Sequence, residues 1–229
     1  MATEEQMIGF RILKRARKVD ADMAAAFREL PVANVSDSMF RLSAGGARLR
    51  PMHDGSPMSG PAFTVKSRPG DNLMLHKALD IADPGDVIVV DAGGDLTNAI
   101  MGEIMSGYAA SRALGGVVIN GAIRDAGALR RASFPVYAAG VTHRGPYKDG
   151  PGEINVPVAI DGMVIEPGDL IVGDEDGVLC VPYDAVQTIY DATSKKHQVE
   201  LGEIEAIARG TFDRAWVDAR LRQLGVRID

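Results

Sequence analysis

Hydrophobic and polar positions in the middle of the chain follow two periods. Short β-branched runs bounded by glycine and proline predict strands, which we place at 62–67, 86–92, 115–121, 134–140 and 169–174. Between some of these runs the apolar positions recur at helical spacing, at about 71–82 and 103–113. Strands that alternate with helices favour a single α/β domain with a core over about 33–183.

The beginning of the chain has a helical pattern instead. Residues 7–30 interleave apolar and charged side chains at helical spacing up to Pro31, which stops the predicted helix. The segment 34–37, Asn-Val-Ser-Asp, is predicted to form a loop that caps another helix from about residue 38. We therefore expect a helical N-terminal extension over about 1–32.

The end of the chain is also predicted to be helical. The stretches from about 183 to 208 and from 212 to 223 carry many charges, so one face is either solvated or packed on another subunit. These stretches define a helical C-terminal arm over about 184–229.

Composition narrows the class of protein. The 229 residues are 46% hydrophobic and 24% charged, which is enough for a packed core. The formal net charge of −6 argues against a main function in binding nucleic acid or anionic membranes, because both need a basic surface. The single cysteine, Cys180, excludes an internal disulfide framework and a zinc site built from several cysteines. The acidic start MATEEQ and the lack of an apolar run near about 18 residues predict a soluble cytoplasmic protein.

The candidate chemistry lies in the segment 91–127, which reads as a strand, a glycine loop, a helix, a second strand and a turn. The helix and the second strand each span roughly 16 Å. A right-handed crossover of matched lengths returns Arg124 and Asp125 to the sheet edge where Glu103 begins the helix. Because open α/β sheets bind ligands at the carboxyl ends of their strands, we expect these three residues to share one pocket.

The backbone beside these side chains suits an anion. Gly102 is predicted to leave the amides of Glu103, Ile104 and Met105 open at a helix N-terminus. Together with the guanidinium of Arg124 and two carboxylates, these amides favour a small carboxylate substrate held beside a divalent cation.

Each charged residue also has a purely structural interpretation, which the sequence leaves open. Asp125 is placed to cap the short helix AGALRRA that follows it. Glu103 in a first helical turn is favoured by the helix dipole alone, and Arg124 is equally suited to be a surface cation paired with either carboxylate.

The same residues resemble the signature of a known family. Glu103-x20-Arg124-Asp125, within GE-x8-R-ALGGVVINGAIRDAG, is similar to the RraA-like family, which includes the 4-hydroxy-4-methyl-2-oxoglutarate / 4-carboxy-4-hydroxy-2-oxoadipate aldolases. VSDSMFRL, GPAFTV, GDVIVVDAGG, VTHRGPY and PGDLIVGDEDGVLCVP extend the resemblance over roughly residues 33–183. The family often has aspartate at the acidic position, and Glu103 adds one methylene without changing the type of ligand.

This resemblance implies a class II pyruvate aldolase that depends on a divalent metal, with oxaloacetate decarboxylation as a side activity. The implied fold is of the swivelling β/β/α type, assembled as a homotrimer or homohexamer with the site at a subunit interface. By analogy Asp125 would ligate Mg²⁺ or Mn²⁺, with waters completing the shell and no organic cofactor.

The resemblance also implies roles for the other residues. Arg124 would bind the pyruvyl carboxylate and keto oxygen, helped by the amides that follow Gly102. Glu103 would orient water in the metal's coordination shell. A glutamate from the neighbouring subunit's C-terminal helix would complete the site, with Glu203 as the candidate and Glu200 as its alternative.

Two other functions stay open. The family includes the regulator of ribonuclease activity, which binds the endonuclease RNase E, so a non-catalytic binding role is one alternative. An aldolase-like enzyme acting on another keto acid is the second. The full acidic-x20-Arg-Asp set and the extensions at both ends favour an enzyme with a small 2-keto acid substrate, for which Arg131 and Arg144 are candidate further cations.

Overall fold

The computed structural model describes residues 7–43 and 47–227. Its main sheet is built on neighbouring parallel strands in the order β3-β4-β6-β7. Their bounds are Met58–Ser67 for β3, Val87–Asp91 for β4, Gly116–Ile123 for β6 and Val136–Val141 for β7. All five strand runs predicted from the sequence are strands in the structure, the fifth being β11 (Leu170–Asp174).

Shorter strands extend the sheet at its edges. β8 (Gly152–Ile154) runs antiparallel to β3, and β1 (Phe10–Ile12) runs parallel to β8. β2 (Arg50–Pro51) is antiparallel to β7, and β5 (Ala99–Met101) is parallel to the end of β6. β11 pairs antiparallel both with the start of β3 and with β12 (Gly177–Val181).

The side chains of the central strands alternate between two cores. Ile88 and Val90 pack with α3 (Leu73–Ile81) and α4 (Glu103–Ser111) on one face. Val87 and Val89 pack on the other face with the hairpin of β9 (Val158–Ile160) and β10 (Met163–Ile165). This alternation follows from the two-residue period of a strand, and it explains why β4 and β6 carry apolar residues on both faces.

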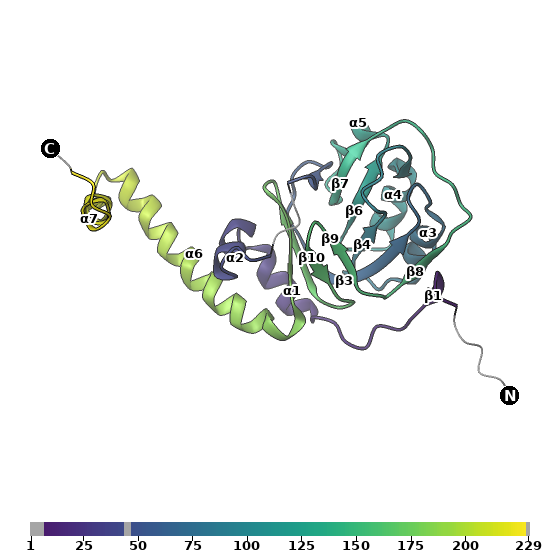
Figure 1. Ribbon diagram of the computed structural model, residues 1–229, viewed down its shortest axis with the longest axis horizontal. Coiled ribbons are helices and arrows are strands. Elements are labelled where there is room, and N and C mark those ends of the chain that lie inside the picture. Colours follow the sequence, from purple (N-terminus) through teal and green to yellow (C-terminus); the bar gives the residue numbers. More distant parts are fainter. Residues whose placement is uncertain (1–6, 44–46, 228–229) are drawn as a thin grey trace.

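A third core packs the helices near the N-terminus against the start of the long C-terminal helix. α1 (Ala21–Arg28), α2 (Val32–Ser38), β11, β12 and the start of α6 (Val186–Ala208) contribute apolar side chains to it. The 3₁₀ turn η1 (Tyr183–Ala185) leads into α6, whose last buried residue is Thr193. The rest of α6 and the following α7 (Ala215–Gln223) extend away from the sheet (Figure 1).

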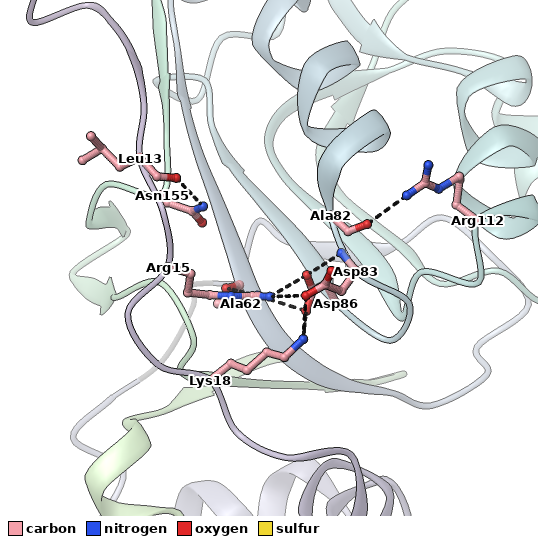
Figure 2. Close-up of polar contacts among 9 residues, drawn as sticks. All are labelled: Leu13, Arg15, Lys18, Ala62, Ala82, Asp83, Asp86, Arg112 and Asn155. Atoms are coloured by element: carbon pink, nitrogen blue, oxygen red, sulfur yellow. Dashed lines mark hydrogen bonds and ion pairs between the residues drawn. The ribbon is translucent and has the colours of Figure 1, made fainter. Parts of the chain in front are cut away.

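The helix predicted over 7–30 is wrong for its first half. Residues 10–12 form β1, and the chain stays without helix until α1, which Asp20 caps by accepting a hydrogen bond from the amide of Met23. Contacts remote in sequence replace the helical ones, as Figure 2 shows for Arg15, which forms a two-pronged ion pair with the fully buried Asp86. Residues 1–6 of the predicted extension lie outside the described residues.

The helix predicted to begin near residue 38 is also misplaced. α2 spans Val32–Ser38 and ends there, and Phe40 and Arg41 follow in the left-handed region with φ of 56° and 60°. The side chain that caps α2 is Asp174, at the end of β11, which accepts a hydrogen bond from the amide of Val32 at 2.9 Å. A cap supplied from a distant strand leaves no local sequence signal.

The predicted C-terminal helices are present as α6 and α7. No helix within residues 7–43 and 47–227 is long and apolar enough to cross a membrane.

Candidate functional site

A small pocket opens at the carboxyl edge of the parallel strands, where segments that follow β3, β5 and β6 meet. Its volume is about 40 Å³. The lining residues come from β5 itself, from the segments after β3 and β6, from the start of α4 and from the loop after β7: Asn72, Ala99, Ile100, Met101, Gly102, Ile104, Met105, Arg124, Asp125 and Pro146. This is the edge at which open α/β sheets bind ligands.

Asp125 holds the pocket together through a contact to the start of α4. Its backbone adopts the left-handed conformation, with φ 57° and ψ 32°, which aspartate tolerates better than most residues. Its Oδ2 accepts a hydrogen bond from the amide of Glu103 at 3.1 Å. The local interpretation, in which the Asp125 side chain caps α5 (Ala126–Leu129), is wrong because no such cap bond is present. The carboxylate caps α4 instead.

Gly102, the N-cap residue of α4, makes that contact sterically possible. Its backbone is extended, with φ −155°, so its conformation does not require glycine. Its surroundings do, because a Cβ atom here would collide with Oδ2 of Asp125 and lie 3.0 Å from Cγ of Arg124. The absence of a side chain at this position lets the two charged residues lie in these positions against the start of α4.

Fewer backbone amides are open at the start of α4 than the sequence predicted. The amide of Glu103 is not open, because it donates to Asp125. The amides of Ile104 and Met105 lie in the first turn, where a helix offers no internal acceptor. The predicted anion site is therefore reduced to these two amides and the positive end of the α4 dipole. The Glu103 side chain is exposed and is not among the lining residues, so only Arg124 and Asp125 of the three predicted charged residues line the pocket.

Arg124 reaches the same pocket from the end of β6. Its amide donates to the carbonyl of Met101 at 2.9 Å, which ties the turn to β5. Its guanidinium Nε lies 3.7 Å from Oδ2 of Asp125, and 47% of its side chain is exposed. The pairing with a carboxylate that the structural interpretation expected is thus present, but it is loose, and the guanidinium makes no hydrogen bond to any described residue that would compete with an anion.

Asn72 is a pocket residue that the sequence reasoning missed. It is 2% exposed, and its Nδ2 donates to the carbonyl of Ile100 at 3.0 Å. Its Oδ1 is buried without a hydrogen-bond partner, and a buried acceptor of this kind calls for a donor such as water or a ligand hydroxyl. Its place between the β3 run and the next helix, at the same sheet edge as Arg124, is the signal that could have identified it.

The two C-terminal glutamates lie on α6 and do not line this pocket. Glu200 is held within the chain by Lys196 at 2.9 Å and by Asn34 at 2.7 Å. The hydrogen bond from Lys196 lowers the pKa of the Glu200 carboxyl. Glu203 is exposed. In Figure 1, α6 and α4 lie on opposite sides of the molecule, so one chain does not bring either glutamate to Asp125.

The pocket's donors suit a hydrated hard cation. Asp125 is the one carboxylate among the lining residues, and its Oδ1 has no hydrogen bond from any described residue. Mg²⁺ is often held by one or two carboxylates with several waters, which this donor set matches. A closed zinc-type site does not fit, since no group of three or more His, Cys, Asp and Glu side chains able to hold a metal occurs within the described ranges.

The core of the chain is similar in sequence to known proteins. A model of the RraA-like family, described as Aldolase/RraA, matches residues 32–180. A protein of Halalkalibacterium halodurans named "Putative 4-hydroxy-4-methyl-2-oxoglutarate aldolase" is 38% identical over 191 residues, which covers 83% of this chain and 91% of that protein.

Solved structures share the same fold. An uncharacterized protein from Pseudomonas syringae pv. tomato has a TM-score of 0.76 at 28% identity, covering 84% of this chain and 95% of its own. Streptomyces coelicolor RraAS2, described as an unusual member of the RNase ES inhibitor RraA protein family, has a TM-score of 0.72 at 28% identity, covering 80% and 96%. The expected mixed α/β fold with C-terminal helices is confirmed.

Proposed function

The chain belongs to the RraA-like family, and from that premise we propose that it is a divalent-metal-dependent aldolase. Its substrate would be 4-hydroxy-4-methyl-2-oxoglutarate or a related 4-hydroxy-2-keto acid, cleaved to pyruvate. The observation that carries this proposal is the hydrogen bond from the Glu103 amide to Asp125, which gathers a carboxylate, the Arg124 guanidinium and a helix N-terminus around one pocket.

The chemistry follows from where charge develops. Cleavage of the bond between carbons 3 and 4 leaves its electron pair on the pyruvyl half as an enolate. Arg124 and the amides of Ile104 and Met105 bind the 2-keto-acid head and stabilise the negative oxygen where it forms. The proton of the 4-hydroxyl leaves to a water that the exposed carboxylate of Glu103 holds. Protonation of the enolate at carbon 3 then gives pyruvate, and the other half departs as a carbonyl compound.

The Asp125 carboxylate would hold Mg²⁺ or Mn²⁺ through its open Oδ1, since Oδ2 is occupied by the helix cap. The cation, when bound, supplies Lewis-acid polarisation of the keto oxygen. Oxaloacetate loses carbon dioxide through the same pyruvate enolate, so decarboxylation of oxaloacetate is the expected side activity.

A single chain supplies only part of the site. Its pocket of about 40 Å³ is far below the roughly 300–1,000 Å³ of ordinary ligand sites. Beside the pocket Ile104 is 84% exposed, and Tyr108, one turn further along α4, is 43% exposed. We propose a homotrimer or homohexamer in which a neighbour's α6 closes the pocket with Glu203, or with Glu200 if it leaves Lys196.

The alternative is a non-catalytic regulator, and the likeness to RraAS2 is the observation that favours it. A coupled lactate dehydrogenase assay for pyruvate separates the two. Chelator-sensitive pyruvate release from 4-hydroxy-4-methyl-2-oxoglutarate with Mg²⁺ supports the aldolase. Release from oxaloacetate alone indicates enolate chemistry on another keto acid. Release from neither substrate, above a blank containing only metal, contradicts catalysis and favours the regulator.

A further inference from the structure

The loop after β7 lies directly against the proposed substrate-binding arginine. A Cβ atom on Gly145 would be 3.5 Å from Nη1 of Arg124. The carbonyl of Gly145 accepts a hydrogen bond from Nδ2 of Asn98 at 2.5 Å, and the carbonyl of Arg144 accepts one from the amide of Ala99 at 2.8 Å. Neighbouring Cα atoms are about 3.8 Å apart. The Cα atom of Arg144 therefore lies within roughly 9 Å of the Arg124 guanidinium.

Tyr147 connects this loop to a second arginine. Its hydroxyl lies 3.5 Å from Nη2 of Arg144, and the guanidinium carbon of Arg68 lies 5.6 Å from the centre of its ring. Tyr147 also exchanges backbone hydrogen bonds with Gly70 and Asn72, at 2.8 and 3.0 Å. Both arginines therefore contact one half-exposed aromatic residue, Arg144 at its hydroxyl and Arg68 over its ring.

The carboxylate of Asp71, which contacts Arg68, already accepts several hydrogen bonds. Asp71 is fully buried, and its Oδ2 accepts hydrogen bonds from the amides of Asp149 and Gly150 and from Nη2 of Arg68. Its Oδ1 accepts from the amide of Leu73. Asp71 thus fixes the two loops and uses one guanidinium nitrogen of Arg68, whose other donors make no hydrogen bond to any described residue.

Arg144, unlike Arg68, has no partner of opposite charge within the described ranges. No carboxylate of a described residue lies within 4 Å of its guanidinium. This exposed guanidinium is therefore available to bind an anion beside the pocket. Arginine pairs with carboxylates in a two-pronged geometry and is weakly hydrated, so it is the side chain suited to such recognition.

We infer that Arg144 and Arg68, joined through Tyr147, form a second anion position that binds a carboxylate at the far end of the ligand. This inference rests on the proposed function for the position of the 2-keto-acid head at Arg124. It makes Arg144 and Arg68 specificity-determining residues for the second carboxylate that a substrate such as 4-hydroxy-4-methyl-2-oxoglutarate carries, and neither residue takes part in bond cleavage.

Binding measurements test the inference without requiring turnover. The dissociation constants of 2-oxoglutarate and 2-oxopentanoate would be measured by calorimetry with Mg²⁺ present. These compounds share the 2-keto-acid head and differ in the second carboxylate. The native protein is expected to bind 2-oxoglutarate with a dissociation constant at least tenfold lower than that for 2-oxopentanoate. This ratio corresponds to the free energy that hydrogen bonds to a charged group contribute. R144Q and R68Q are expected to lose this preference while binding of 2-oxopentanoate stays the same.

R222Q, which removes an exposed arginine from α7, is the matched control and should keep the preference. Equal affinity of the native protein for both compounds would overturn the second anion position. Equal weakening of both compounds in R144Q would overturn it too, since the side chain would then act on the head or the fold. A native protein that shows the preference but releases no pyruvate from any hydroxy-keto acid supports the inference and refutes the aldolase.

Discussion

Oδ2 of Asp125 accepts a hydrogen bond from the backbone amide of Glu103 at 3.1 Å, although the two residues are 22 positions apart. The contact joins the end of β6 to the start of α4, so a residue proposed to hold a cation also caps a helix. One Asp125 oxygen is committed to the fold and the other remains for chemistry. Substitutions can therefore separate the two roles.

Asp125→Asn should separate them most cleanly. The asparagine side chain keeps an oxygen that can accept from the Glu103 amide but loses the charge that a divalent cation needs. We expect metal-dependent pyruvate release to be abolished while the thermal midpoint changes little. Asp125→Ala should lose turnover and also cost about 0.5–2 kcal/mol of stability, the usual value of a helix cap. Turnover by D125N at the native rate would remove Asp125 as the metal ligand.

Gly102→Ala tests the close approach that brings the charges together. The added Cβ would displace Asp125 and Arg124, and displacements of about 1 Å can cost about a hundredfold in rate. Gly107→Ala is the matched control on the same helix, because a Cβ there meets no atom within 4 Å. We expect G107A to keep activity and gain up to about 1 kcal/mol of stability. Equal activities of G102A and G107A would show that the approach is irrelevant to function.

Arg124→Ala should lose most turnover and, together with it, inhibition by pyruvate, because both depend on binding the 2-keto-acid head. Initial rates with and without added pyruvate measure the two effects, and a urea titration reports the fold. The side chain makes one loose contact with Asp125, so a small change in stability is expected. A variant that loses stability alone would instead identify Arg124 as a structural surface cation.

Much of this site could be predicted from the sequence because its geometry is local. Matched lengths of helix and strand in one crossover were enough to predict that Arg124 and Asp125 return to the start of the helix, and in the structure Asp125 contacts the Glu103 amide with Arg124 beside it. The occupied Glu103 amide could not be predicted, since it depends on the left-handed backbone of Asp125. Asn72 was missed because it comes from a different strand segment, with no fixed spacing to the motif.

The errors at the N-terminus have a similar cause. The helical spacing of residues 7–20 is real in the sequence, but pairing of β1 with β8 and ion pairs to remote carboxylates determine the backbone there. Such long-range contacts override a weak local propensity. The roles of Glu203 and Glu200 stay predictions, because they depend on a second copy of the chain.

Mixing two inactive variants tests whether a second copy of the chain completes the site. If the site forms between subunits, D125N supplies an intact α6 and E203Q supplies an intact Asp125. Co-expressed in equal amounts, they should recover about a quarter of native turnover, the statistical share of interfaces that join one intact half from each. E200Q in place of E203Q decides between the two glutamates. Inactive parents that yield no activity when mixed would contradict a site shared between neighbours.

The N-terminal segment should make stability depend on pH through Glu153. This carboxylate is 10% exposed and accepts hydrogen bonds from Nε and Nη2 of Arg11 and from the amide of Gly9. The hydrogen bond from Arg11 lowers its pKa in the folded protein. A lowered folded pKa gives stability that is present above the unfolded pKa of about 4.3 and is lost as the pH falls through the folded value.

Glu153→Gln should therefore be less stable than the native protein at pH 7, and the difference in unfolding free energy should shrink as the pH falls from about 5 to 3. Urea titrations at several pH values measure this difference. Glu205→Gln is the control, because its pair with Arg209 is largely exposed on α6 and such pairs contribute about 0–1 kcal/mol. A pH-independent difference for E153Q would mean that packing of the side chain, rather than its charge, holds β1 against β8.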